Sequence, residues 1–221
     1  MIMAEGDMKK VEKALAALAR HEFETKYFAT GAEAAAWLDA QVPEGATVGQ
    51  GGSVTLDELG LIQRFKERGL AVPNPWDGTL SDEQRRLAYR DALFADNFFC
   101  SANAITLDGF ILNVDGRGNR LAAHLFGPRR LFIVAGVNKL VEDEAAAFER
   151  VKYAAPRNCR RLSLKTPCVV TGACSNCDTP ARSCRAYLLL RRPTRAVPTT
   201  VVLIGEELGF GGTVAVILLF L

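Results

Sequence analysis

A glycine-rich loop at residues 47–58, with the sequence TVGQGGSVTLDE, carries the first residues that could do chemistry. An apolar run precedes it, and apolar residues with the helical period follow it over Leu56–Arg68, so the sequence predicts a strand, a turn and a helix. Thr55 and Glu58 have the spacing of a capping box, which would place backbone N–H groups at the helix start. Such groups attract anions, and glycines let a phosphate or carboxylate approach the backbone. The residues that we expect to bind an anionic ligand here are Gly49, Gly51, Gly52, Ser53 and Thr55.

The loop has neither the Gly-Lys-Ser/Thr of a Walker loop nor a dinucleotide fingerprint. The common nucleotide-binding motifs are therefore not indicated. The alternative to an anion site is that the glycines only make a tight turn at the end of a strand.

A second polar cluster runs from Asp108 to Arg120 and combines two carboxylates with carboxamide and guanidinium groups. If it faces the glycine loop, Gly118, Asn119 and Arg120 form the other wall of a pocket, and Arg120 could hold a carboxylate or phosphate through two hydrogen bonds. Asp108 and Asp115, lying near one another or near Lys139, could then transfer protons, so all three are candidate catalytic residues. The alternatives are that both aspartates stabilise Asp-Gly turns and that Lys139 is a surface lysine. Neither histidine, His21 or His124, belongs to a recognisable catalytic arrangement, and both are interpreted as structural.

Four of the six cysteines lie within one short segment and are candidate metal ligands: Cys168, Cys174, Cys177 and Cys184. Four thiolates can hold a zinc ion or an iron–sulfur cluster. The spacing matches neither a ferredoxin nor a zinc ribbon, so the metal stays open, and a redox-active dithiol or unligated thiols are the alternatives. Cys100, in an apolar run, is expected in the core. Cys159 has no assignment.

The elements that must position these residues begin with an alternation of strand and helix up to about Phe94, which predicts a mostly parallel sheet flanked by helices. A strand is expected at Gly69–Val72 within it. From Asn97 onward, short apolar runs separated by Asp-Gly turns predict an inserted β-meander. A buried strand at Leu131–Ala135 is followed by a helix from about Glu142 to Tyr153, which Pro156 should end. The last strand is expected at Thr200–Ile204.

Composition favours one α/β domain over residues 1–212, with residues 159–190 as a cysteine-containing appendage and 213–221 as an apolar tail. That tail is too short to span a bilayer, which needs roughly 20 apolar residues. The net charge of +2, with both signs interleaved, indicates neither a nucleic-acid partner nor a membrane surface. The first 20 residues are amphipathic and do not resemble a signal peptide, so we expect a cytoplasmic protein.

The ordered set of motifs resembles the lactate-utilization (LUD) domain family over about Val11–Gly209. The motifs are GQGGSVTLDELG from Gly49, NAITLDG from Asn103, NVDGRGNR from Asn113 and GVNK from Gly136. The resemblance implies a fold similar to ribose-5-phosphate isomerase, coenzyme A transferases and 5-formyltetrahydrofolate cyclo-ligase. Isomerase-like relatives use acidic residues and a lysine in this region, and Asn103 is assigned to the ligand site with the other motif residues.

The resemblance also implies a part in bacterial oxidation of lactate to pyruvate, alongside iron–sulfur partner subunits. The sequence therefore favours a protein of organic-acid utilization that binds a small anionic molecule, as an accessory enzyme or as a subunit. One alternative is a metal or iron–sulfur electron-transfer module that uses the cysteine segment. Another is a non-catalytic ligand-binding or assembly subunit, and a homo-oligomer is compatible with each of these.

Overall fold

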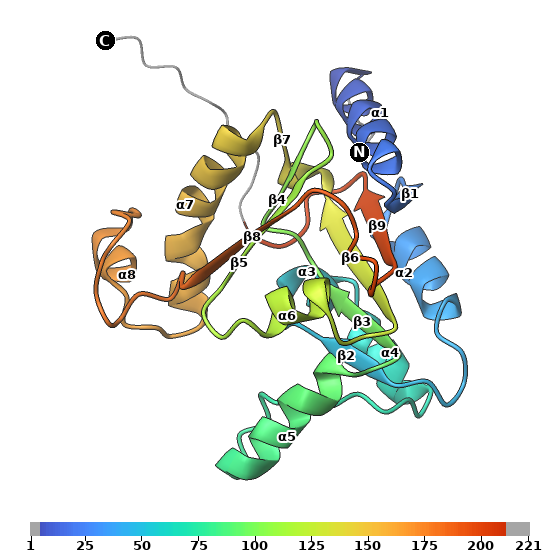
Figure 1. Cartoon of the computed structure of the whole chain (residues 1–221), viewed down its shortest axis with the longest axis vertical. Helices are drawn as coiled ribbons and strands as arrows, with labels where there is room; N and C mark the ends of the chain where they lie inside the picture. The colour runs from blue at the N-terminus through green and yellow to red at the C-terminus, as the bar shows by residue number, and fades with distance from the viewer. Residues whose placement is uncertain (1–4, 211–221) are drawn as a thin grey trace.

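The computed structural model describes residues 5–210, which fold around a parallel sheet of five strands (Figure 1). Every neighbouring pair in this sheet runs parallel. Three of its strands are buried along their whole length, as expected for a sheet covered on both faces. The spatial order is β1 (Glu24–Phe28), β9 (Thr199–Ile204), β6 (Arg130–Gly136), β3 (Asn97–Cys100) and β2 (Val48–Gln50).

Helices cover both faces of this sheet and create two cores. Successive strand residues point to opposite faces, so Phe98 packs with Leu18 of the first helix, whereas Phe99 packs with Phe65 on the other side. The prediction of a mostly parallel α/β sheet flanked by helices is confirmed. The helices that precede β3 are α1 (Glu5–Arg20), α2 (Gly31–Ala40), α3 (Val54–Glu58), α4 (Leu61–Glu67) and α5 (Asp82–Leu93).

The predicted meander is present as the antiparallel pair β4 (Ala104–Thr106) and β5 (Ile111–Asp115) of a second, mixed sheet, whereas its first predicted run, from Asn97, is β3 of the parallel sheet. The order of the mixed sheet is β7 (Leu140–Val141), β4, β5 and β8 (Ala186–Leu190). β5 runs antiparallel to β4 and β8, while β7 runs parallel to β4. α7 packs on this sheet through Ala147 and Val151. The remaining elements are α6 (Asn119–Leu125), the 3-10 helix η1 (Val137–Lys139), α7 (Glu144–Arg161) and α8 (Pro167–Thr171).

The predicted helix over Leu56–Arg68 is divided into α3 and α4. Gly60, at φ +62°, takes a left-handed conformation that ends the regular helix between them. The strand expected at Gly69–Val72 is reduced to one bridge between Thr47 and Ala71. Both differences shorten the regular structure and leave its order unchanged.

The prediction that Pro156 ends its helix was wrong, because α7 continues through it to Arg161. Proline cannot donate to the carbonyl of Lys152, but Lys152 is exposed, so water can satisfy that carbonyl. Buried residues on both sides of the proline, Val151 and Cys159, keep the helix packed. One helix therefore joins the second sheet to the cysteine segment.

The predicted appendage, residues 159–190, spans the end of α7, then α8, a coil, and β8 of the second sheet. The apolar tail predicted at 213–221 lies outside the described residues. No helix within residues 5–210 is both long and apolar enough to cross a bilayer.

Candidate functional site

The carboxyl ends of β2, β3 and β6 lie side by side and are followed by the polar residues of the candidate site. Gly51–Ser53 follow β2, Ser101 follows β3, and Val137–Lys139 follow β6. Ligands of α/β proteins bind outside this edge of the sheet. The predicted loop and the predicted lysine thus share the edge at which a ligand is expected.

The loop glycines each have a steric reason in the fold. A Cβ atom on Gly49 would overlap the Ala92 carbonyl of α5, and one on Gly51 would overlap the side chain of Arg120. Gly52, at φ +69°, would place a Cβ 2.9 Å from the Trp76 ring. Turn geometry and close packing therefore account for the glycines, and ligand binding by their backbone stays a prediction.

Ser53, not Thr55, caps the helix after the loop. The Ser53 hydroxyl accepts from the Leu56 N–H at 3.4 Å, and Thr55 lies inside α3. The capping box expected from Thr55 and Glu58 was wrong, because the helix begins two residues earlier, at Val54. Glu58 is used differently: its carboxylate accepts from the Gly209 N–H at 2.7 Å.

Lys139 is buried, with 4% of its surface exposed, so the alternative of a surface lysine is wrong. Its ammonium group donates to the Phe210 carbonyl at 2.6 Å. Burial, followed by the nearby Arg150 charge, lowers the pKa of Lys139 to about 8, against a smaller opposing effect of Glu58. Within residues 5–210, no carboxylate lies close enough to form an ion pair with it.

Arg150 of α7 places a second cation near Lys139. Its guanidinium donates to the carbonyls of Asn138, Asn103 and Phe210, and burial lowers its pKa to about 10. The segment 205–210 covers this region. In it, Gly209 lies between Thr55 and Lys139: a Cβ added there would be 2.6 Å from the Thr55 hydroxyl and 3.3 Å from the Lys139 nitrogen.

Ser101, which lies outside the predicted motifs, also belongs to this edge. Its side chain is 8% exposed, and among the residues that the structure describes its hydroxyl oxygen has no hydrogen-bond partner. Buried polar atoms are nearly always paired, so an unpaired one calls for an explanation. Its position directly after β3 was the available signal, since polar residues at strand ends line such edges.

Arg120 was expected to hold the ligand, but its guanidinium is engaged within the protein. It forms an ion pair with the buried Asp115 and donates to the Val114 carbonyl. Asp115 also accepts from the backbone N–H groups of Arg120 and Leu121, which caps the start of α6. This pair therefore builds the wall beside Gly51, where Gly118, at φ +85°, and Asn119 make the turn into α6.

The family model of the LUD domain matches residues 11–204. The chain belongs to the LUD domain family. The match ends at the last residue of β9, so the segment 205–210 that contacts Lys139 follows the LUD match. Comparison with curated proteins gives no match.

The LUD fold is also found in a solved structure, that of a DUF162 family protein from Deinococcus radiodurans. The two structures align with a TM-score of 0.54 and 13% sequence identity, over 92% of this chain and 100% of the other. At that identity the likeness concerns the fold alone. It agrees with the fold class predicted from the sequence.

Asn103 of the LUD motif lies directly before β4 and is hydrogen-bonded to β5. Its side-chain oxygen accepts from the Val114 N–H, and its own N–H donates to the Asn113 side chain, each at 3.0 Å. Asn113 in turn contacts His124 at 3.0 Å, and burial lowers the pKa of His124 to about 4. His124 is therefore a neutral, buried histidine, in agreement with its structural interpretation. Its neighbour Cys100 is fully buried in the core.

Asp108 does not share a site with Asp115, contrary to the expectation that the two carboxylates lie together. Asp108 is exposed in the turn before β5, and Asp115 is the buried residue at the far end of that strand. The following residue, Gly109, takes φ +83° and packs against Ala17 of α1. The structure thus supports the turn interpretation for Asp108, while Asp115 lies at the candidate edge.

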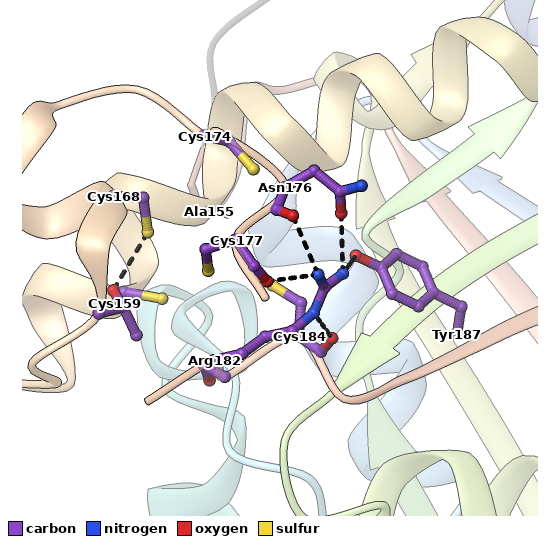
Figure 2. A pocket seen from close by; sticks show the side chains of 11 residues that line it. Ala155, Cys159, Cys168, Cys174, Asn176, Cys177, Arg182, Cys184 and Tyr187 are labelled. Atoms are coloured by element: carbon purple, nitrogen blue, oxygen red, sulfur yellow. Dashed lines mark hydrogen bonds between the residues drawn. The ribbon is translucent and has the colours of Figure 1, made fainter. Parts of the chain in front are cut away.

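The predicted metal ligands Cys168, Cys174, Cys177 and Cys184 line one pocket beside α7, away from the sheet edge (Figure 2). All are free thiols, and the unassigned Cys159 lines the same pocket. Burial, followed by the neighbouring Cys174, raises the pKa of Cys184. Among the described residues, no three His, Cys, Asp or Glu side chains are arranged as the ligands of a metal ion.

Proposed function

We propose that this LUD-domain protein binds a small carboxylic acid at the carboxyl edge of the parallel sheet and acts in lactate or other organic-acid utilization. The family assignment supports a role in organic-acid metabolism, since the family takes its name from lactate utilization. The ligand class rests on the chemistry of the edge itself.

The observation that carries the proposal is the buried ammonium group of Lys139. A charge removed from water is costly unless an opposite charge or several hydrogen bonds compensate it. The Phe210 carbonyl supplies one hydrogen bond, and the Arg150 guanidinium nearby adds like charge. Glu58 acts on Lys139 and Glu207 acts on Arg150, but for both cations the effect of burial is larger. A ligand carboxylate would neutralise this region.

The Ser101 hydroxyl supports a ligand that carries a second polar group. A 2-hydroxy acid presents a carboxylate and a neighbouring hydroxyl, which match a cation and a hydrogen-bonding hydroxyl at one edge. Lys139, with a pKa of about 8, is mostly protonated at neutral pH and can also release a proton there. It would therefore hold the carboxylate, and it is the candidate for proton transfer.

Calorimetric titration with L-lactate and with pyruvate tests this proposal. Lys139→Met keeps an unbranched side chain of similar size and removes its charge, so we expect the affinity to fall by at least about tenfold, or ~1.4 kcal/mol. Ser101→Ala should weaken lactate more than pyruvate, because only lactate offers a hydroxyl.

Lys152→Met is the matched control, since Lys152 is an exposed lysine on α7. It should bind both acids as the wild type does. Absence of binding to the wild type, or equal binding to Lys139→Met, would refute the proposal.

A further inference from the structure

The cysteine segment forms a pocket that the proposed ligand site does not use. Five of the six cysteines line it, and they come from three parts of the chain: α7, α8 and the coil that precedes β8. Figure 2 shows these side chains gathered around one space, with Tyr187 of β8 at its margin. Cys159, at the end of α7, therefore lines the same pocket as the cysteines of α8 and of the coil.

The two helical cysteines form the inner part of the pocket. Cys159 and Cys168 are both buried, and the Thr166 hydroxyl lies 3.1 Å from the Cys168 sulfur. Cys174, Cys177 and Cys184 are half-buried on the outer side. Of the cysteines in the predicted ligand set, Cys168 is therefore shielded from water, and the other three reach the pocket from the coil.

Arg182 organises that coil. Its guanidinium donates to the carbonyls of Cys177 and Cys184, each at 2.7 Å, and to the Tyr187 hydroxyl at 3.2 Å. It also donates to the side-chain oxygen of Asn176 at 3.0 Å. A fixed positive charge therefore lies beside the thiols and would offset the charge of thiolates.

We propose that Cys168, Cys174, Cys177 and Cys184 hold a metal centre as thiolates. Four thiolates are the ligand set of both a structural zinc ion and an iron–sulfur cluster, and Cys174 and Cys177 have the two-residue spacing of a chelating pair. Each thiol would release its proton on binding. In the arrangement described, the thiols line the pocket without enclosing an ion, so binding requires their side chains to turn inward.

The test is the content of zinc, iron and acid-labile sulfide in the full-length protein purified without oxygen. We expect one centre per chain, either zinc alone or iron with sulfide and visible charge-transfer absorption. In Cys174→Ser/Cys177→Ser the metal content should fall by about tenfold or more. Cys100→Ala, which removes the cysteine outside the pocket, should retain the centre.

A second measurement avoids dependence on the folding of the variant. Titrating the wild-type protein with an organomercurial reagent should release metal in step with the thiols that it blocks. Wild-type protein without metal, or a double variant that keeps it, overturns the proposal. Because the readout is metal and not carboxylate binding, this result is independent of the function proposed for Lys139.

Discussion

Lys139 sets the expected pH dependence of ligand binding. Its protonated form attracts a carboxylate, and its pKa of about 8 lies well below the ordinary 10.5 because the group is buried. Lactate affinity should therefore be constant below pH 8 and fall about tenfold per pH unit above it. Calorimetric titrations from neutral to alkaline pH check this. An affinity that is unchanged above pH 8, or the same decline in Lys139→Met, would show that another group binds the acid.

His124 should make the folded state sensitive to acid. Its pKa is about 4 in the folded protein and 6.5 when unperturbed, because burial disfavours the charged ring. As the pH falls from 6.5 to 4, the unfolded chain takes up a proton that the folded chain does not, so stability decreases. The difference corresponds to about 3 kcal/mol.

Urea unfolding at pH 6.5 and pH 4.5 measures this effect. His124→Gln lacks the titrating ring, so it should lose less stability over the same range than the wild type does. Equal losses in the two proteins would mean that other groups cause the acid sensitivity.

The packing of α5 against β2 depends on a glycine that the sequence assigned to ligand binding. Gly49→Ala would push a Cβ into the backbone of α5 at Ala92, and overpacking against backbone should cost about 3 kcal/mol. Gly60→Ala is the comparison, because nothing lies within 4 Å and only the left-handed φ is penalised, by about 1 kcal/mol. Thermal unfolding of both variants measures which substitution costs more stability. A smaller loss of stability for Gly49→Ala than for Gly60→Ala would contradict this packing.

Elements were more predictable than their ends. Apolar periodicity located the main strands of the parallel sheet and several of the helices around it, because burying an apolar face largely determines such elements. It did not identify α6, α8 or β8. The ends depend on single contacts: Ser53 in place of Thr55 caps α3, and Gly60 divides the following helix. Pro156 lies within α7 because tertiary packing outweighs its local preference.

At the scale of the whole molecule, the site residues that the sequence missed depend on contacts between distant segments. Ser101 is a short polar residue outside any motif. It is a candidate site residue because the fold places it beside the ends of β2 and β6. Arg120 matched a ligand-binding pattern, yet its guanidinium forms an ion pair with Asp115, five residues earlier. Cys159 lies in the thiol pocket because α7 continues past Pro156. Spacing along the chain does not contain this information.

Arg150 ties these distant segments together. Its side chain, 2% exposed, donates to Asn138 after β6, to Asn103 before β4, and to Phe210 beyond β9, so one guanidinium links both sheets and the covering segment. Lysine has a single nitrogen and cannot span three carbonyls. Arg150→Lys would leave buried acceptors unpaired and should reduce the free energy of unfolding by about 3 kcal/mol.

Urea unfolding of Arg150→Lys, with Arg157→Lys as the control, measures this role. Arg157 lies on the same helix but is exposed and stacks only on Tyr153 among the described residues, so its replacement should cost less than about 0.5 kcal/mol. Because Arg150 also reaches Phe210, which accepts from Lys139, the variant should loosen the covering segment and raise hydrogen exchange at residues 205–210. Equal stability of the two variants would mean that the sheets are held together by apolar packing alone.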